Sequence, residues 1–598
     1  MPSQSAPSHQ RFFAELKRRQ VFRVMTVYGA SAFVVIQAAD VIFPGIPLPP
    51  WTVSLVVWLC LLGFPIAIAM AWVFERTPEG LRRTDEADEA EIAEIVTQPA
   101  SRRWPAGIVA FVGLALLVAG GWWALRGPLA GNASYESIAV LPFLDLSTEE
   151  SDAYFGDGLA EELLNALAGV PDLKVAARTS SFAFRGAELD VREIGRALDV
   201  ETVLEGSVRR SRDSLRVTAQ LIDARTGYHL WSDDYDTSSA DIFRVQDALA
   251  RSIVEALAVH LRGETPERLF VGGTDDPVAY DLYMEARQLW TTREMPKLWS
   301  ALEKFDAAIA RDSGFAAAWS GRADVLDAIA WRAPEARDSV PAAKYAAQRA
   351  LILEPELAEG WASLGVLALD FDLDWRVAEL ALRRAIEIRP SYATPHHWLA
   401  DVYRWQGQAR ASLGPGLRAI ELSPLSTLGK DGHAQTLVLL GDWKGARDLY
   451  IELAESGTAD GSYASLLTLG RRFGFTADEL EGWARTLFRN RGWEDWQRAG
   501  PIGRGILDPE SRDAGLASLA DYAADGGNLR DVAELAVALG GHEAAFRYLE
   551  HAEEVGWPLS PIGVDPAFDP LREDPRMARL MERLGVPNGY DPAADPPN

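Results

Sequence analysis

Long apolar runs dominate the first part of the chain. They cover residues 24–43, 52–74 and 106–125, and each reaches the roughly 20 residues that a helix needs to cross a bilayer. Asp40 is the only charged residue within these runs. The pattern therefore predicts three transmembrane helices within residues 24–126, with the lipid bilayer as their partner.

Arginine clusters indicate the orientation of these helices. One cluster precedes the first run, and another occupies the loop between the second and third runs. Positively charged loops stay on the cytoplasmic side. We therefore expect a basic cytoplasmic N-terminus over 1–23, a cytoplasmic loop over 75–105, and all later residues on the far side of the membrane.

Beyond residue 135 the apolar runs become short and alternate with amphipathic segments. Alternation of apolar and polar positions predicts strands, and leucines at helical spacing predict helices. One α/β domain is expected over 135–265, and Asp157 is expected to cap its first helix. The strands are predicted at 137–143, 173–177, 202–210, 215–223 and 229–235, and the helices at 157–168, 191–198 and 241–260.

This segment resembles the TolB amino-terminal domain and the related FlgO-like domain. The likeness is carried by SIAVLPF from Ser137, YFGDGLAEELLNALA from Tyr154, KVAARTSSFAFRG from Lys174, VLEGSVRRS from Val203 and LRVTAQLIDARTGYHLWSDDYD from Leu215. Domains of this type occur beside tetratricopeptide repeats in bacterial signalling proteins. The resemblance implies a binding and assembly module with no catalytic residues to carry over, and a Gram-negative source.

From residue 276 onward the sequence is almost entirely amphipathic helix interrupted by proline and glycine. Pro355, Pro390 and Pro424 recur near the 34-residue tetratricopeptide period. Trp361 and the following Leu-Gly pair match that repeat, so residues 276–460 resemble a tetratricopeptide solenoid. The expected units are 278–315, 316–357, 358–392, 393–426 and 427–457, with an insertion in the second unit around residues 331–339.

The period fades after residue 460. Residues 461–598 are expected to form degenerate helical repeats and a C-terminal cap that resembles the end of TolB-plus-repeat proteins. The predicted fold class is thus a membrane-anchored multidomain protein, with three transmembrane helices, one α/β domain and an all-α solenoid.

Charge and residue usage narrow the function. The 598 residues carry a formal net charge of −27 and one cysteine, Cys60. The negative charge argues against nucleic-acid binding, which needs a basic face. A single cysteine excludes an intramolecular disulfide framework and a cysteine-based metal site. A basic partner region is favoured electrostatically.

The concave groove of a solenoid usually receives a protein or peptide segment. Large aromatic residues are the candidates for contacts there, and we expect Trp331, Trp375 and Trp405 to reach the groove or the insertion surface. A second candidate is the hairpin cluster Arg209, Arg210 and Arg212. These arginines form either an exposed turn or an anion-binding site.

Catalytic motifs are missing from the sequence. It lacks a P-loop, a dinucleotide fingerprint, a zinc-protease motif and a nucleophile elbow. The adjacent pair His396 and His397 would point about 100° apart on a helix, so the two rings cannot readily share a metal. We therefore expect no catalytic residues, no cofactor and no metal site, and predict that the chain is not an enzyme.

Together these patterns favour a non-enzymatic scaffold or sensor in the bacterial inner membrane, with its α/β domain and repeats in the periplasm. The alternative is a signalling receptor that acts on a cytoplasmic partner in trans, of the adenylate-cyclase or transcriptional kind. The sequence identifies neither the partner nor the process, and leaves the oligomeric state open, a homo-oligomer included.

Overall fold

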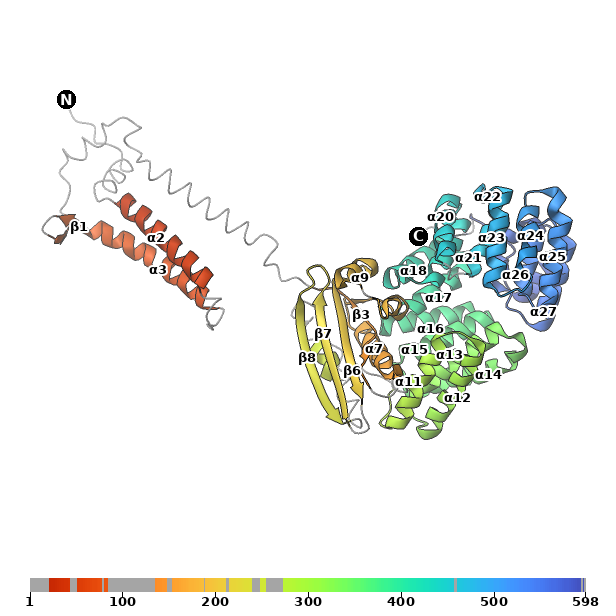
Figure 1. The fold of residues 1–598 in the computed structure, drawn as a ribbon, viewed down its shortest axis with the longest axis horizontal. Helices are drawn as coiled ribbons and strands as arrows, with labels where there is room; N and C mark the ends of the chain where they lie inside the picture. The colour runs from red at the N-terminus through yellow and green to blue at the C-terminus, as the bar shows by residue number, and fades with distance from the viewer. Residues whose placement is uncertain are drawn as a thin grey trace, which may run out of the picture. The chain divides into compact units, whose positions relative to one another are not determined.

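The computed structural model describes residues 21–42, 51–77, 80–83, 135–147, 153–187, 189–210, 214–238, 248–253, 273–456, 460–592 and 595. The chain divides into two compact units, Met1–Ala133 and Ser134–Asn598. Figure 1 shows the ribbon with its element labels. Each unit is described by itself below.

The first unit contains two helices that pack side by side, α2 (Val21–Ile42) and α3 (Trp51–Val73). Tyr28 joins them, because its hydroxyl donates a hydrogen bond to the carbonyl of Cys60 at 2.9 Å. A short antiparallel hairpin follows, with strands β1 (Phe74–Thr77) and β2 (Gly80–Arg83).

The helices α2 and α3 cover two of the three apolar runs of the sequence. Counting only the residues that it describes, the structure holds no helix with both the length and the hydropathy of a membrane span. The third run, residues 106–125, lies outside the described residues.

The second unit begins with a mixed β-sheet in the strand order β5-β3-β6-β7-β8. Strand β3 runs parallel to β5 and β6, whereas β6, β7 and β8 form an antiparallel meander. A two-residue strand, β4, pairs with the outer part of β6. The strands are β3 (Ser137–Val140), β4 (Leu144–Asp145), β5 (Lys174–Val175), β6 (Thr202–Arg210), β7 (Ser214–Asp223) and β8 (His229–Ser238).

Helices cover both faces of this sheet, as the alternation along β3 requires. Ile138 and Val140 belong to the hydrophobic core that includes α7 (Ala153–Ala168), whereas Ala139 and Leu141 pack with α9 (Val191–Leu198) on the other face. A capping box of Asp190 and Glu193 starts α9. A single turn, α8 (Arg178–Ser181), lies between these helices.

One detail of the predicted α/β domain is wrong. Asp157 does not cap the first helix, because α7 begins four residues earlier, at Ala153. Asp157 instead lies within the helix, where its carboxylate pairs with Arg185. Of the predicted helix 241–260, only residues 248–253 are described, and they are helical.

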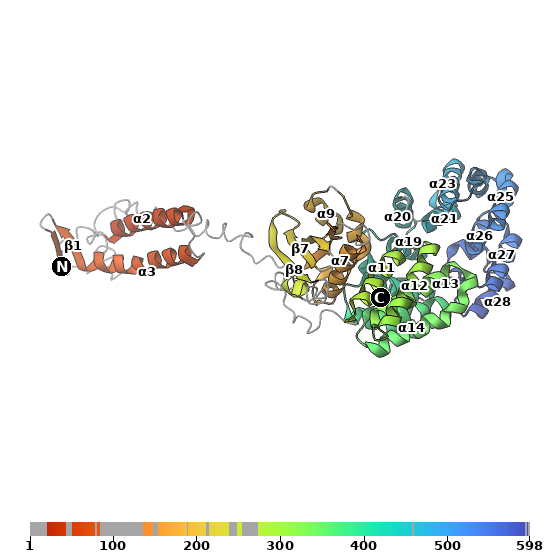
Figure 2. The same ribbon diagram turned by 60° about the horizontal axis from the view of Figure 1, so that its bottom comes forward.

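Helix pairs fill the next part of the unit, and each predicted repeat unit contains one pair, which confirms the tetratricopeptide-type solenoid (Figure 2). The predicted insertion is the short turn η5 (Pro334–Ser339), and a π-helical turn, η6 (Ala368–Asp372), extends α15. The first helices are α11 (Pro277–Thr291), α13 (Ala316–Arg332), α15 (Ala358–Leu367), α17 (Ala393–Trp405) and α19 (Thr427–Leu439). The second helices are α12 (Met295–Arg311), α14 (Val340–Leu353), α16 (Trp375–Ile388), α18 (Ala409–Leu422) and α20 (Trp443–Glu455).

A repeated hydrogen bond explains the tryptophans that begin these units. The indole nitrogens of Trp319 and Trp361 each donate to a carbonyl six residues earlier, those of Ser313 and Pro355. In α17 a ring nitrogen of His396 lies 3.0 Å from the carbonyl of Pro390, in the same place. These aromatic side chains therefore anchor the start of each first helix and are structural.

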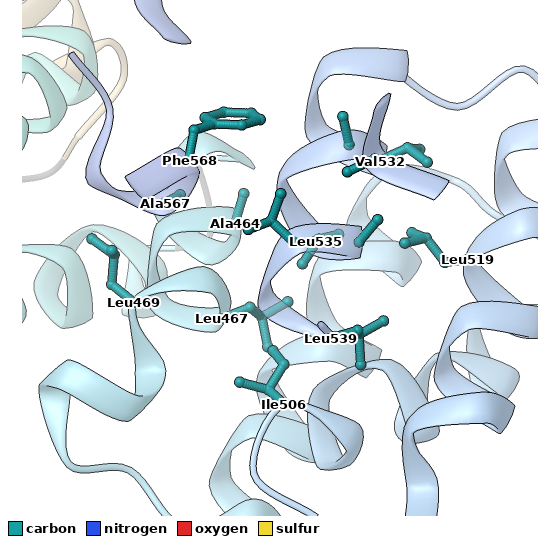
Figure 3. Close-up of a cluster of buried hydrophobic side chains, with 14 of the residues drawn as sticks. Ala464, Leu467, Leu469, Ile506, Leu519, Val532, Leu535, Leu539, Ala567 and Phe568 are labelled. Carbon is teal, nitrogen blue, oxygen red and sulfur yellow. The ribbon is translucent and has the colours of Figure 1, made fainter. Parts of the chain in front are cut away.

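The C-terminal part builds a second large core, shown in Figure 3. It also returns to the middle repeats: Arg337 in η5 donates to the carbonyl of Gly556 at 2.6 Å, and Val564 packs with Ala409 and Leu439. Its helices are α21 (Asp460–Thr468), α22 (Gly470–Phe473), α23 (Ala477–Asn490), α24 (Gly500–Gly505), α25 (Arg512–Ala524), α26 (Leu529–Ala538), α27 (His542–Val555) and α28 (Pro575–Leu584), with turns η7 (Trp496–Ala499), η8 (Pro509–Ser511), η9 (Ser560–Gly563) and η10 (Pro566–Leu571).

Candidate functional site

The solenoid has an inner face formed by the first helices of its pairs. Successive first helices, α11 to α13 and onward to α19, pack closely on one another, and the second helices do so less. A stack of this kind curves toward the helices that approach each other more closely. The inner face is therefore the surface of α11, α13, α15, α17 and α19.

The α/β domain docks onto the beginning of this inner face. Helix α7 packs on α11, and one hydrophobic core joins Leu159 and Leu163 of α7 to Tyr283 and Met284 of α11. No gap separates the two parts of the unit, because Gly158 has a side-chain atom of Met284 where a Cβ would stand.

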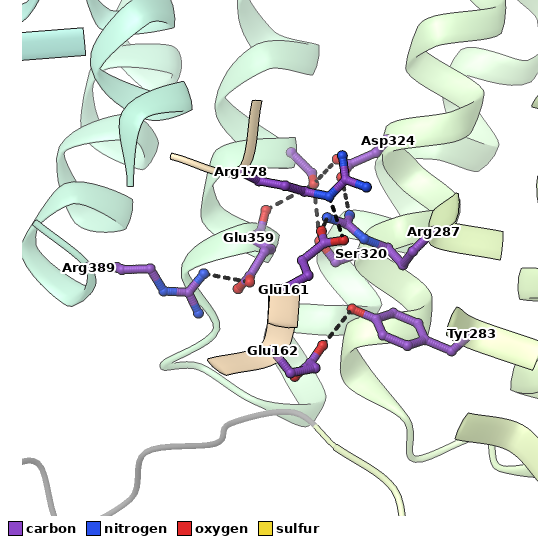
Figure 4. A network of polar contacts seen from close by, with 10 residues as sticks. Glu161, Glu162, Arg178, Tyr283, Arg287, Ser320, Asp324, Glu359 and Arg389 are labelled. Carbon is purple, nitrogen blue, oxygen red and sulfur yellow. Dashed lines mark hydrogen bonds and ion pairs between the residues drawn. The ribbon is translucent and has the colours of Figure 1, made fainter. Parts of the chain in front are cut away.

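A buried polar network lies over this contact (Figure 4). Glu161 of α7 pairs with Arg287 of α11 and accepts a hydrogen bond from Arg178 at 2.9 Å. Its side chain is 7% exposed. Burial acts to raise the pKa of Glu161, but the charges of Arg287 and Arg178 outweigh it and hold that pKa below its usual value.

The carboxylate beside it behaves in the opposite way. Glu162 accepts a long hydrogen bond, 3.4 Å, from the hydroxyl of Tyr283. Burial, together with the negative charges of Glu359 and Glu161, raises the pKa of Glu162 to about 7. The two neighbours on α7 therefore differ because only Glu161 has an arginine partner.

The network continues across the inner face to α13 and α15. Asp324 accepts a hydrogen bond from Ser363 at 2.5 Å, and Arg287 approaches its other oxygen at 3.9 Å. Burial raises the pKa of Asp324 to about 6. Glu359 pairs with Arg389 at 2.5 Å, which closes the network on the side of α16.

Hydrogen bonds to backbone carbonyls also fix the α/β domain to later repeats. The Ser391 hydroxyl donates to the carbonyl of Leu173 at 2.7 Å, and the amide of Ala177 donates to the carbonyl of Leu422 at the same distance. A fourth attachment joins Arg210 to Asp281 through two hydrogen bonds of 2.9 and 2.8 Å. Together with the shared core, these contacts make the α/β domain and the repeats one body.

Farther along the inner face lies a row of carboxylates, of which Asp401 pairs with Arg404 at 2.7 Å. Asp327 of α13, Asp370 of η6, Asp401 of α17 and Asp431 of α19 follow one another across successive first helices, and we call these four residues the carboxylate ladder. Burial and the charges of Asp327 and Asp401 raise the pKa of Asp370 well above its usual value. Burial and the charge of Asp324 likewise raise the pKa of Asp327 to about 7.

Several buried polar atoms of the inner face have no hydrogen-bond partner among the described residues. Among them are Oδ1 of Asp327 and the indole nitrogens of Trp290 and Trp405. Trp405 is 6% exposed. Leaving such an atom unpaired costs about 1–3 kcal/mol, so these positions are where an external partner would gain most.

The structure brings the predicted tryptophans together. Trp405 lies in a small hydrophobic core, and Trp331 and Trp375 pack against it while staying half-buried. Trp375 also lines an open depression of about 580 Å³, formed by Asp372, Leu373, Asp374, Trp375, Arg376, Glu379 and Gln406. Trp331 and Trp375 therefore retain accessible surface for a partner, whereas Trp405 exposes little of its side chain.

The predicted arginine cluster is divided. Arg209 is exposed on β6, where it lies directly opposite Arg216 of β7. Arg210 pairs with Asp281 and stacks on Phe155, so it attaches the α/β domain to the solenoid. Arg212 lies outside the described residues.

Sequence reasoning missed both the docked network and the carboxylate ladder. A signal was present: Asp324 and Asp327 stand three residues apart, and Asp401 and Trp405 four apart, so each pair shares one helix face. Within the described part of the chain, histidine, cysteine and carboxylate side chains form no group that could hold a metal ion.

Comparison with known proteins gives limited similarity. No family model matches the chain. A protein named "Putative adenylate cyclase 3" from Rhizobium meliloti (strain 1021) is 48% identical over 152 residues, which is 25% of this chain and 26% of that protein. The matched stretch thus spans about a quarter of the relative's length.

Two solved structures are tetratricopeptide proteins. One, from Parabacteroides merdae ATCC 43184, is 12% identical, with 48% of this chain and 96% of that chain covered and a TM-score of 0.28. The other, YrrB, is described as having an unusual peptide-binding site; it is 13% identical, with 41% and 97% covered and a TM-score of 0.22. The repeat fold of this chain is established by its own helix pairs.

Proposed function

We propose that the chain is a non-enzymatic scaffold or sensor that binds a segment of a partner protein along the open part of its inner face. The observation that carries this proposal is the set of buried polar atoms without partners, at Trp290, Asp327 and Trp405. They lie on the inner face, where a bound chain would supply backbone donors and acceptors.

The docked α/β domain limits where such a partner fits. It occupies the beginning of the inner face through α7 and the Glu161 network. The open part therefore runs from the end of α13, past Trp331, to α19, and Trp375 at the start of α16 packs against the core beneath it. The likeness of residues 135–265 to TolB amino-terminal domains supports an assembly role for the docked domain.

Photo-crosslinking in living cells tests this proposal. A crosslinking amino acid replaces Trp331 or Trp375, and the matched control carries it at Tyr345 or Ile352, which are 58% and 69% exposed on the second helix α14. The proposal expects one envelope protein, identified by mass spectrometry, from the first pair only. Purified partner must then bind the full-length chain; equal capture from all four positions would contradict the proposal.

A membrane anchor in the first 126 residues is part of the proposal, with the later residues in the periplasm. What supports it is the sequence: the 23 residues of α3 contain no charged side chain, and arginines flank the apolar runs. Alkaline carbonate extraction should leave the chain in the membrane pellet, and external protease should cut it only after the outer membrane is opened. Release by carbonate would contradict the anchor.

A second candidate is a receptor that controls a cytoplasmic signalling partner in trans. The name of the Rhizobium relative favours it, although the match covers only 26% of that protein. Purified chain should then make no cyclic AMP alone, whereas deletion of its gene should change cellular cyclic AMP. Synthesis by the purified chain would overturn the non-enzymatic proposal.

A further inference from the structure

We infer that the carboxylate ladder binds the lysine or arginine side chains of an extended, cationic segment of the partner. This inference rests on the proposed function and gives the partner its chemical class. It concerns Asp327, Asp370, Asp401 and Asp431, on four successive elements of the inner face.

Asp370 is the centre of the ladder. It lies in the π-helical turn η6, which extends α15 toward the following loop. Its charge interacts with those of Asp327 on one side and Asp401 on the other, and no described cation acts strongly on it. An ammonium or guanidinium group at this place would offset the repulsion between Asp370 and Asp327, whereas Asp401 already has Arg404.

Cations of the chain act on three members of the ladder. Arg293 and Arg332 act on Asp327. Arg404 pairs with Asp401 at 2.7 Å, and both Arg404 and His397 act on Asp431. Asp370 is thus the member left for a cation from outside the chain.

Trp405 supplies an independent reason to expect a ligand here. Its side chain is 6% exposed and its indole nitrogen has no acceptor among the described residues. The ring packs with Ala368 and Leu369, the two residues before Asp370, and stands one helical turn beyond Asp401. An extended peptide offers a carbonyl oxygen for this indole while its side chains reach the carboxylates.

Cation binding should release protons. Burial raises the pKa of Asp327 to about 7, so this acid is partly protonated at neutral pH, and the pKa of Asp370 is raised as well. A bound cation favours the ionised form, so affinity should increase as pH rises from 6 to 8. The charged and titratable groups facing the ladder are Asp324, Arg287, Arg293, Arg332, His397 and Arg404, and the pKa of Asp324 is raised to about 6.

The test uses fluorescein-labelled peptides of five Lys-Gly, Ser-Gly or Glu-Gly repeats with the full-length chain, at low and physiological salt. The inference expects the Lys-Gly peptide to bind best and the Asp370→Asn variant to weaken it about tenfold or more, as for loss of a charge-assisted contact. The control variants Asp448→Asn and Asp478→Asn, at side chains 57% and 84% exposed, should bind as the parent does.

Each other outcome is decisive. Equal loss in the control variants would mean attraction by net charge alone and would overturn the inference. Equal or weaker binding of the Lys-Gly peptide relative to Ser-Gly would also overturn it, while the crosslinks from Trp331 and Trp375 would still support the proposed function. Thermal unfolding of each variant distinguishes lost binding from lost folding.

Discussion

The two ends of the inner face use the same kind of helix in different ways. At α11 and the start of α13, the carboxylate of Glu161 is brought by α7 and meets Arg287 and Arg178. At the end of α13 and in η6, the charge of Asp327 acts on Asp370, and no cation of the described residues acts strongly on Asp370. In the first region the chain supplies its own arginine partners for the buried acid. In the second region the acid Asp370 lacks such a partner, so a partner protein can supply one.

The difference shows in the direction of the pKa shifts. Arginine partners keep the pKa of Glu161 low despite its burial. Burial and neighbouring negative charges raise the pKa of Asp370. Similar burial therefore produces a fixed ion pair in one region and a proton-binding acid in the other, and the arrangement of arginines determines which.

The largest expected effect comes from breaking the completed interface. Arg287→Ala leaves the Glu161 carboxylate buried with reduced compensation, and removal of one partner from a buried pair costs about 3–5 kcal/mol. Chemical denaturation of the full chain should show this loss. The control Arg216→Ala removes an exposed ion pair with Asp236 and should lower the free energy of unfolding by less than about 1 kcal/mol. Equal losses in the two variants would contradict the special contribution of the buried pair at Glu161.

Arg210→Ala should have the next largest effect. It removes the bidentate contact with Asp281. The side chains of Arg210 and Asp281 are 18% and 26% exposed, and a hydrogen bond between charged groups contributes about 1.5–3 kcal/mol to stability. Limited proteolysis should then cut between the α/β domain and α11 sooner than in the parent chain. An unchanged cleavage rate would show that the hydrophobic core alone fixes the domain.

Asp327→Asn should act in the opposite direction and stabilise the chain. An acid with a pKa of about 7 when folded, against about 3.9 when unfolded, binds more protons in the folded state. Its contribution to stability therefore falls as pH rises from about 4 toward 7 and beyond. Asparagine does not ionise, so the variant should gain about 1–2 kcal/mol at pH 8 and less at pH 5, as measured by denaturation at both values. A gain independent of pH would contradict the raised pKa.

The smallest effect is expected at Arg209. Its side chain is exposed and opposite Arg216 on the neighbouring strand. Arg209→Ala should change the free energy of unfolding by less than about 0.5 kcal/mol, and binding of the Lys-Gly peptide should be unaffected. Stronger peptide binding in this variant, from removal of a like charge, would place the cationic segment on the sheet and away from the solenoid.

Local patterns in the sequence predicted much of the fold. The strand Thr202–Arg210 and the helix Val191–Leu198 appear with the expected bounds, because alternation and helical spacing express which face is buried. The start of α7 was predicted wrongly because the sequence offers more than one preferred capping residue: Asp152, directly before Ala153, is of the same type as Asp157. The repeat period was visible because proline and tryptophan recur at fixed places in each pair.

The candidate site was less predictable, because it depends on which distant residues meet. Arg209 and Arg210 look alike in the sequence, yet only Arg210 reaches Asp281, 71 positions away. Trp405 was expected at the surface, but the bend of the stack places it under Trp331 and Trp375. Successive acids of the ladder lie 30 to 43 positions apart in the sequence, so their interaction depends on the stacking of successive units.

Hydrogen–deuterium exchange of the full-length chain, with and without the Lys-Gly peptide, tests most directly whether the inner face has a closed and an open region. The expected result is slower exchange in the end of α13, η6 and α17 when the peptide is bound, with α7 and α11 unchanged. Faster exchange in α7 and α11 on binding would show that the peptide displaces the docked domain, and would contradict the division of the inner face into a closed part and an open one.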